Sequence, residues 1–138
     1  LDTNYEGKAA AAIEALSSGD NFVFLHVEAP DESGHEGNLA HKLKAIEDFD
    51  ARIVGPVLEG LKAFDDYSVL LMPDHPTPLC TKTHSSAPVP FVVYGSRGFP
   101  LPAGYKKAER YSEKDAAGTG LFIDDASTLM GSMMKGSF

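Results

Sequence analysis

Apolar and polar residues alternate along the chain in two different periods, which predict both helices and strands. The first helix is indicated by an alanine-rich stretch over residues 8–16. Thr3 and Glu6 before it match a capping box, and Gly19 after it matches a glycine that ends a helix. We therefore expect the chain to open with a helix that ends near Gly19.

A second, longer helix is predicted between Asn38 and about Phe64. Apolar residues return there at helical spacing, at Leu39, Leu43, Ile46, Phe49, Ile53, Val57 and Leu61. The Gly55-Pro56 pair interrupts this pattern, so we expect a kink or a break at that point. An acidic cluster on the same segment is expected to be a solvated helix face, and it comprises Glu47, Asp48 and Asp50.

Three short apolar runs have the length and composition of buried strands. They are Asn21–Glu28, Ser68–Met72 and Pro90–Tyr94. The first run is followed by Ala29–Gly37, which is rich in turn-forming residues and has no hydrophobic period, so it is expected to be a loop. A second polar loop is expected over Leu79–Pro88.

The order strand, helix, strand, loop, strand is typical of an α/β fold. The simplest arrangement is a parallel pair of strands joined by a right-handed crossover. The signal weakens after Gly95, where only Ser112–Ala117 and Asp125–Met134 have a helical pattern. The predicted sheet therefore lies in the first two thirds of the chain.

Composition limits the classes of protein to which the chain can belong. Its 138 residues fit one domain, and 20 acidic against 12 basic residues give a net charge of −8, which argues against a nucleic-acid-binding surface. The apolar runs are too short to span a membrane.

The single cysteine, Cys80, excludes an intramolecular disulfide and fits a reducing compartment. The chain begins at Leu1 rather than methionine, so we expect a piece of a longer protein.

Aspartate and histidine side chains gather at the ends of the predicted strands. Asp31 and His35 lie in the loop after the first strand, Asp74 and His75 end the second, and His84 precedes the third. The carboxyl ends of parallel strands share one edge of a sheet, where ligands bind. Adjacent residues of an extended strand point in different directions, so Asp74 and His75 need a turn to serve one ion.

A mixed set of oxygen and nitrogen ligands suits borderline divalent ions such as Zn²⁺ and Mn²⁺. Five candidates exceed the needs of one tetrahedral ion, and two ions about 3.5–4 Å apart would use them better. Each pair taken alone also has an ordinary explanation, because an aspartate and a histidine four residues apart often form a capped turn. His84 alone would be a surface loop residue. The coincidence of all five at strand ends favours a metal site.

The remaining chemically active residues have ordinary explanations. His26 lies inside the first predicted strand and is expected to be a core histidine, with a supporting role behind a metal ligand as the alternative. His41 is expected to be solvated, and Cys80 to be either a packing residue or an incidental loop residue. Lys82 and Arg97 could meet an anionic substrate, but surface placement is the better explanation of each.

Four segments resemble a known family. HVEAPDESGHEG (His26–Gly37), MPDHPTP (Met72–Pro78) and THSSAPVPFVVYG (Thr83–Gly95) resemble the metal-binding segments of cofactor-independent (2,3-bisphosphoglycerate-independent) phosphoglycerate mutases of the archaeal type. KAIEDFDARIVGPVLEGL (Lys44–Leu61) resembles the family's sequence between the first two of these motifs. This family belongs to the alkaline phosphatase superfamily. The resemblance therefore implies part of a three-layer sandwich with a mainly parallel sheet flanked by helices.

The resemblance also implies a division of the ligands between two ions. Asp31, His35 and His84 would bind one divalent ion, and Asp74 and His75 would bind the other. The expected cofactors are two divalent ions, Mn²⁺ or Zn²⁺, with Mg²⁺ or Co²⁺ as alternatives. Family members also use a serine nucleophile and a further aspartate near the chain start, neither of which has a counterpart here. The second ion would therefore be weakly held, and residues 1–138 would be the C-terminal portion of a metalloenzyme domain without its nucleophile-bearing part or its substrate domain.

The function implied by this resemblance is metal-dependent phosphoryl transfer. The complete enzymes are cytoplasmic and interconvert 3-phosphoglycerate and 2-phosphoglycerate, so the expected partner is a phosphorylated small molecule, with neither nucleic acid nor membrane involved. The chain alone would be inactive. Alternatives are a proposed homoserine kinase, another phosphotransferase or phosphatase of the superfamily, and a metal-binding module without catalysis. The sequence gives no indication of oligomeric state.

Overall fold

The computed structural model describes residues 3–136, which form two compact units. The first unit contains the chain up to Phe64 together with the loop Thr77–Ser85. The second contains Asp65–Pro76 and the chain from Ser86 onward. Within residues 3–136 no helix combines the length and apolar character that crossing a bilayer requires.

The first unit opens with the expected helix, α1 (Tyr5–Ser17). Its N-cap is Asn4, whose side-chain oxygen accepts a hydrogen bond from the backbone N–H of Gly7 at 3.0 Å. The prediction of a capping box at Thr3 was wrong, because the helix begins one residue later and asparagine caps as well as threonine does.

The long helix is continuous, but it changes its winding. It consists of α3 (Leu39–Phe49), a π-helical turn η1 (Asp50–Val54) and α4 (Gly55–Leu61). The backbone N–H of Gly55 bonds to the carbonyl oxygen of Asp50, five residues earlier. Pro56 offers no backbone N–H and its ring crowds the preceding turn, so a wider turn accommodates it. The predicted disturbance at Gly55-Pro56 is therefore a π-helical turn and not a break.

Residues predicted as a loop after the first apolar run form a helix, α2 (Ala29–Glu36). Pro30 stands in its first turn, where a missing N–H costs nothing, and Asp31 and Glu32 lie at the end of the helix dipole that favours negative charge. Gly37 ends the helix with a left-handed φ of 71°. The loop prediction was wrong because α2 has few apolar residues, although its start and stop signals are present in the sequence.

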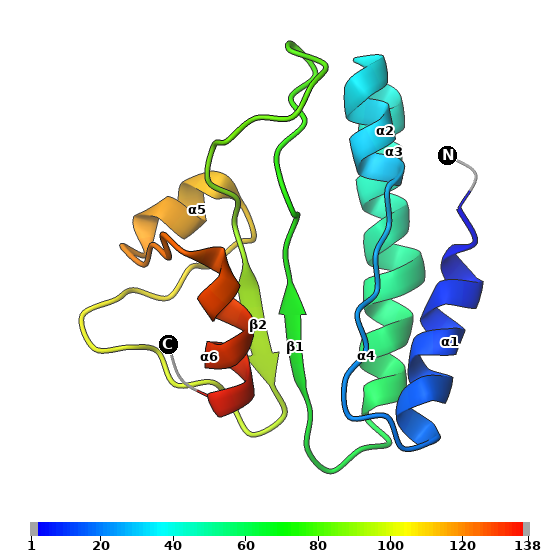
Figure 1. Cartoon of the computed structure of the whole chain (residues 1–138), viewed down its shortest axis with the longest axis vertical. Coiled ribbons are helices and arrows are strands. Elements are labelled where there is room, and N and C mark those ends of the chain that lie inside the picture. Colours follow the sequence, from blue (N-terminus) through cyan, green and yellow to red (C-terminus); the bar gives the residue numbers. More distant parts are fainter. Residues whose placement is uncertain (1–2, 137–138) are drawn as a thin grey trace. The chain divides into compact units, whose positions relative to one another are not determined.

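The run Asn21–Glu28 is extended but forms no β-ladder among the described residues. Its side chains alternate as in a strand: Phe22 and Phe24 are 48% and 75% exposed, whereas Leu25 and Val27 pack against the core. In Figure 1 this segment is the blue trace that leads from α1 to α2. The strand prediction was wrong, because a strand requires a partner that residues 3–136 do not supply.

The core of the first unit lies between the helices and the extended segment. α1 packs against η1 and α4, and α2 packs against α3 (Figure 1). The buried residues of this core are Tyr5, Ala9, Ala29, Ala45 and Ile53. Three of the five are alanines, whose small side chains allow the helices to pack closely.

One side of this core is closed by Arg52. Its guanidinium lies 4.6 Å from the centre of the Tyr5 ring and donates two hydrogen bonds to the carboxylate of Glu6, at 2.6 and 2.9 Å. These bonds lower the pKa of Glu6 from 4.5 to about 2. The same arrangement joins α1 to the π-helical turn.

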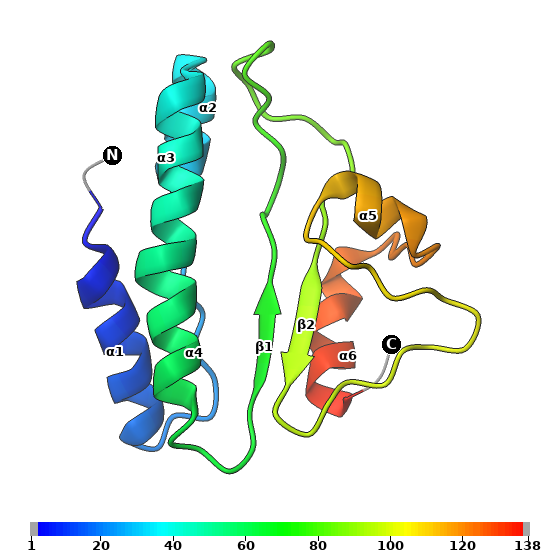
Figure 2. The same cartoon turned by 180° about the vertical axis from the view of Figure 1, so that it is seen from behind.

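The sheet of the second unit consists of β1 (Ser68–Leu71) and β2 (Val92–Gly95). The two strands are antiparallel, with Ser68 opposite Gly95 and Leu71 opposite Val92, and their arrows point in opposite directions in Figure 2. Helices and strands both occur, as the α/β prediction requires. The predicted parallel pair is absent from residues 3–136, because the first apolar run does not join the sheet.

The helices of the second unit agree closely with the sequence pattern. They are α5 (Glu113–Gly118), a single 3₁₀ turn η2 (Ala126–Thr128) and α6 (Leu129–Lys135). Leu129 and Met133 are buried one helical turn apart on α6. This unit therefore has a small core of its own.

Candidate metal centre

Helix α2 places Asp31 and His35 on one face. The two residues are one helical turn apart, and Nε2 of His35 lies 3.3 Å from Oδ2 of Asp31. An aspartate and an imidazole at this spacing can direct their donor atoms to one point. The helix, which the sequence pattern did not reveal, is therefore what brings these two predicted ligands together.

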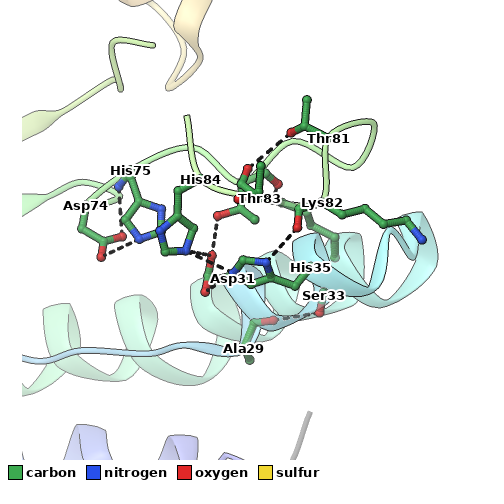
Figure 3. A network of polar contacts seen from close by, with 12 residues as sticks. Ala29, Asp31, Ser33, His35, Asp74, His75, Thr81, Lys82, Thr83 and His84 are labelled. Atoms are coloured by element: carbon green, nitrogen blue, oxygen red, sulfur yellow. Dashed lines mark hydrogen bonds and ion pairs between the residues drawn. The ribbon is translucent and has the colours of Figure 1, made fainter. Parts of the chain in front are cut away.

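His84 reaches the same point from the loop Thr77–Ser85. Its Nε2 lies 3.3 Å from Oδ1 of Asp31 and 3.1 Å from Nε2 of His35 (Figure 3). The two imidazole rings are tilted by 47° with their centres 4.9 Å apart. Two imidazoles and one carboxylate thus converge within the first unit.

The backbone carbonyl of Lys82 determines where His35 carries its proton. Nδ1 of His35 lies 2.9 Å from the carbonyl oxygen of Lys82, which can only accept a hydrogen bond. The Nδ1 position is therefore assigned the N–H, and a neutral ring then has its lone pair on Nε2. Histidines that bind metals are commonly oriented by this kind of bond on the other nitrogen.

The loop that supplies this carbonyl has an unusual backbone at Lys82. Its φ is 54°, in the left-handed region that residues other than glycine rarely adopt. Gly37 faces it, and a Cβ at Gly37 would lie 2.3 Å from Cε of Lys82. Glycine at the end of α2 therefore leaves room for the end of the Lys82 side chain.

Asp31, His35 and His84 are called the trio below. Their nitrogen and oxygen donors fit a divalent ion. Zinc–nitrogen and zinc–oxygen bonds of about 2.0–2.1 Å in a tetrahedron place neighbouring donors roughly 3.3–3.4 Å apart. The two Nε2 atoms are 3.1 Å apart, close to this spacing, and each lies 3.3 Å from a different oxygen of Asp31, His35 from Oδ2 and His84 from Oδ1. The imidazole pair therefore has the spacing of two ligands of one ion, and the carboxylate has an oxygen near each of them. Without a cation or an additional proton, the lone pair of His35 would face a carboxylate, which is unfavourable.

The other two predicted ligands, Asp74 and His75, belong to the second unit and contact each other. Nε2 of His75 lies 3.2 Å from Oδ2 of Asp74, and the backbone N–H of His75 donates to Oδ1 at 3.0 Å. The chain bends at both residues after β1 ends, which supplies the turn that adjacent ligands require. Both side chains can therefore contribute donor atoms on the same side of the chain.

Two residues that sequence reasoning missed support the trio. The hydroxyl of Thr77 donates a hydrogen bond to Oδ1 of Asp31, and Thr77 is only 4% exposed. The ammonium group of Lys42 on α3 donates to the backbone oxygen of Thr77 at 2.6 Å. The spacing of these residues carries no signal, because their contacts depend on how the loop Thr77–Ser85 returns to the helices.

The other histidines and the cysteine lie outside the trio. His26 is exposed, and its ring stacks on Phe24 with the ring centres 6.1 Å apart, so the prediction of a core histidine was wrong. The reason is that the extended segment Asn21–Glu28 pairs with no strand among the described residues, so no sheet buries His26. His41 is exposed, as expected, and its Nδ1 lies 2.8 Å from a carboxylate oxygen of Glu36. Cys80 is exposed in its loop, as expected of an incidental loop residue.

The charged residues are mostly at the surface, as predicted. Lys82 and Arg97 are both exposed, and Arg97 lies 3.5 Å from a carboxylate oxygen of Asp66. Glu47 and Asp50 are exposed on the long helix. Asp48 differs, because its side chain is only 14% exposed and it forms ion pairs with two basic neighbours on the long helix. The acidic cluster is therefore not wholly a solvated face.

Comparison with known proteins gives one family match over nearly the whole chain. The sequence profile described as Metalloenzyme superfamily matches residues 1–133. The solved "Structure of PH0037 protein from Pyrococcus horikoshii" is similar, with a TM-score of 0.83 and 29% sequence identity over 98% of this chain and 38% of that chain.

Curated relatives have higher identity. A "Probable 2,3-bisphosphoglycerate-independent phosphoglycerate mutase" of Geobacter sulfurreducens is 53% identical over 134 residues, which are 97% of this chain and 32% of that protein. A 2,3-bisphosphoglycerate-independent phosphoglycerate mutase of Methanosarcina barkeri is 51% identical over 136 residues, or 98% of this chain and 33% of that protein. The chain thus spans about a third of the length of the curated relatives that it matches.

Proposed function

Because the chain belongs to the metalloenzyme superfamily, we propose that it is part of a metal-dependent phosphoglycerate mutase. The complete enzyme would interconvert 3-phosphoglycerate and 2-phosphoglycerate through a phosphoserine. The names of the curated relatives support this activity, and their greater length means that the rest of the protein would take part in it.

The observation that carries the proposal is the convergence of His35, His84 and Asp31. The Lys82 carbonyl holds the proton of His35 at Nδ1, so that Nε2 offers a lone pair toward a carboxylate 3.3 Å away. An ordinary ion pair would require a second proton on the ring, at Nε2. A divalent cation would satisfy the same Nε2 together with Nε2 of His84, 3.1 Å away, and the arrangement therefore suits a divalent cation.

The residues of the trio also suit a phosphorylated substrate. A bound divalent ion lowers the pKa of a coordinated hydroxyl and spreads the charge that develops on a transferring phosphoryl group. Asp31 supplies one negative charge, whereas neutral histidines supply none. The trio can therefore hold a cation firmly without making the site too negative for a phosphate ester. Nitrogen and oxygen donors together favour Zn²⁺ or Mn²⁺.

Asp74 and His75 are proposed to hold a second ion. They offer one carboxylate and one imidazole, fewer protein ligands than the three or four that zinc usually has. A serine nucleophile and a further aspartate from the rest of the protein would complete this site. We therefore expect weak binding of the second ion by residues 1–138 alone.

We further propose that residues 1–138 are the C-terminal portion of a larger metalloenzyme domain, with a three-layer sandwich and a mainly parallel sheet. The extended segment Asn21–Glu28 supports this view. It alternates inward and outward side chains as a strand does, and its exposed Phe22 and Phe24 would suit a neighbouring layer. Pairing with strands from the rest of the protein would complete the sheet.

The test is a comparison of substrates with the complete protein. After reconstitution with Mn²⁺ or Zn²⁺, it should convert 3-phosphoglycerate into 2-phosphoglycerate, and His41→Ala should retain this activity because His41 lies outside the trio. Chelation should abolish activity, and Mn²⁺ should restore it. Activity only with homoserine and ATP would instead identify a kinase, and full activity in the metal-free protein would contradict the metal-dependent mechanism.

A further inference from the structure

Thr77 connects the loop Thr77–Ser85 to the carboxylate of Asp31. Its hydroxyl donates to Oδ1 of Asp31, and its side chain is buried, with 4% of the residue exposed. A carboxylate can only accept hydrogen bonds, so the single hydroxyl proton of Thr77 must be directed at Asp31. Thr77 therefore restricts the rotation of that carboxylate.

Such restriction matters because an aspartate carboxylate turns easily about its last side-chain bond, where the preferred angles are broad. Asp31 must direct one oxygen toward His35 and the other toward His84, each at 3.3 Å. The hydrogen bond from Thr77 to Oδ1 favours the carboxylate orientation in which Asp31 contacts both histidines.

Lys42 holds Thr77 in turn. Its ammonium donates a hydrogen bond to the Thr77 backbone oxygen at 2.6 Å. The buried residue Gly34 lies beside both groups. A Cβ at Gly34 would lie 2.6 Å from that oxygen and 2.9 Å from the Lys42 nitrogen. Glycine is therefore required at this position of α2 if both groups are to keep their places.

We propose that Thr77 is a positioning residue that fixes the Asp31 carboxylate for divalent-cation binding, and that Lys42 holds Thr77 in place. This inference rests on the metal site proposed above. Neither residue is assigned as a ligand. Their effect is exerted through Asp31, in the way that residues bonded to a metal ligand commonly raise affinity by about 10- to 100-fold.

The experiment titrates the complete protein with Co²⁺ and follows both the dissociation constant and the visible absorption of the bound ion. Thr77→Val keeps the shape and removes the hydroxyl, so the dissociation constant should rise by about 10- to 100-fold. The absorption spectrum should also change, because it reports the geometry of the ligands. Thr77→Ser keeps the hydroxyl and should restore both properties. Lys42→Met should produce a smaller rise.

Thr81→Val is the matched control. Thr81 lies in the same loop, but its hydroxyl donates only long bonds of 3.3 Å to the Pro78 and Thr83 carbonyl oxygens. This variant should bind Co²⁺ as the unaltered protein does. General damage to the loop would affect Thr77→Ser as well as Thr77→Val, so rescue by serine separates positioning from folding.

Two results would overturn the inference in distinguishable ways. If the unaltered protein and Thr77→Val bind Co²⁺ with equal affinity and the same spectrum, Thr77 does not position Asp31, and the metal site itself stands. If the unaltered protein binds no Co²⁺, Zn²⁺ or Mn²⁺, the proposed function fails, and the role of Thr77 fails with it.

Discussion

The Nε2 atoms of His35 and His84 face each other at 3.1 Å, and both lie 3.3 Å from the carboxylate of Asp31. Since Nδ1 of His35 donates to the Lys82 carbonyl, a neutral His35 has no proton for either neighbour. A cation among the three donors would resolve this conflict, and we propose that this is why residues from α2 and a distant loop converge there.

Removal of either imidazole should therefore weaken cation binding. We expect His35→Ala and His84→Ala each to raise the dissociation constant for Zn²⁺ by at least about 100-fold, more than the loss of a supporting residue. Isothermal titration calorimetry measures this effect, and in the complete protein catalytic activity should fall in parallel. His41→Ala is the control, because His41 is exposed and pairs with Glu36. Unchanged affinity in either variant of the trio would remove that residue from the ligand set.

Lys82 should act through its backbone and not through its ammonium group. Lys82→Gly keeps the carbonyl that orients His35 and suits the φ of 54°, so Zn²⁺ affinity should be retained. Lys82→Val should lower the free energy of unfolding by about 1 kcal/mol, because a β-branched side chain is more strained than lysine at this φ. Urea unfolding and zinc titration of both variants provide the measurement. A large loss of affinity in Lys82→Gly at unchanged stability would show that the ammonium takes part.

The Glu6–Arg52 pair should make the stability of the first unit depend on pH in acid. The Arg52 hydrogen bonds lower the pKa of Glu6 from 4.5 to about 2 in the folded state, so the carboxylate favours folding above pH 4.5. This contribution should be lost as the pH falls from about 4.5 through about 2. Urea unfolding between pH 2 and pH 6 should show a shallower decline for Glu6→Gln than for the unaltered protein.

The effect should be small, because the carboxylate is exposed and solvent screens it. Glu14→Gln makes the same change at an exposed position of α1. In this variant the free energy of unfolding should fall with pH as steeply as in the unaltered protein. Equal slopes for Glu6→Gln and the unaltered protein would contradict the role of the ion pair.

A side chain at Gly34 should separate α2 from the loop Thr77–Ser85. We expect Gly34→Ala to lower the free energy of unfolding by about 1–3 kcal/mol, because the new methyl group meets backbone rather than a movable side chain. Gly131→Ala on α6 meets nothing within 4 Å and should raise the free energy of unfolding by about 0.5–1 kcal/mol. Equal effects in the two variants, measured by denaturant unfolding, would contradict the close contact at Gly34.

Helices with strong local signals could be predicted from the sequence, and α2 could not. The alanine run of α1 and the apolar spacing of α3 and α4 identify those helices directly. By contrast, α2 is polar and short, and its apolar content is too low for a periodic pattern. Only Pro30 and Gly37 mark its ends. Strand prediction failed at Asn21–Glu28 for another reason, since a strand depends on a partner elsewhere in the chain.

The five candidate ligands could be picked out because aspartate and histidine are chemically distinctive at any position in a fold. The resemblance to the family implied that Asp31, His35 and His84 share one site, and the structure brings these three side chains together. Their binding of a metal ion stays a prediction. Thr77 and Lys42 could not be predicted, because a threonine hydroxyl and a lysine ammonium acquire their roles only from the path of the loop.

Anomalous X-ray diffraction from zinc-soaked crystals can show whether Asp31, His35 and His84 together bind a divalent cation. We expect a zinc peak about 2.0–2.2 Å from Nε2 of His35, Nε2 of His84 and a carboxylate oxygen of Asp31. Absence of a zinc peak among these residues, while the two Nε2 atoms stay 3.1 Å apart and each lies 3.3 Å from the Asp31 carboxylate, would contradict the proposed site.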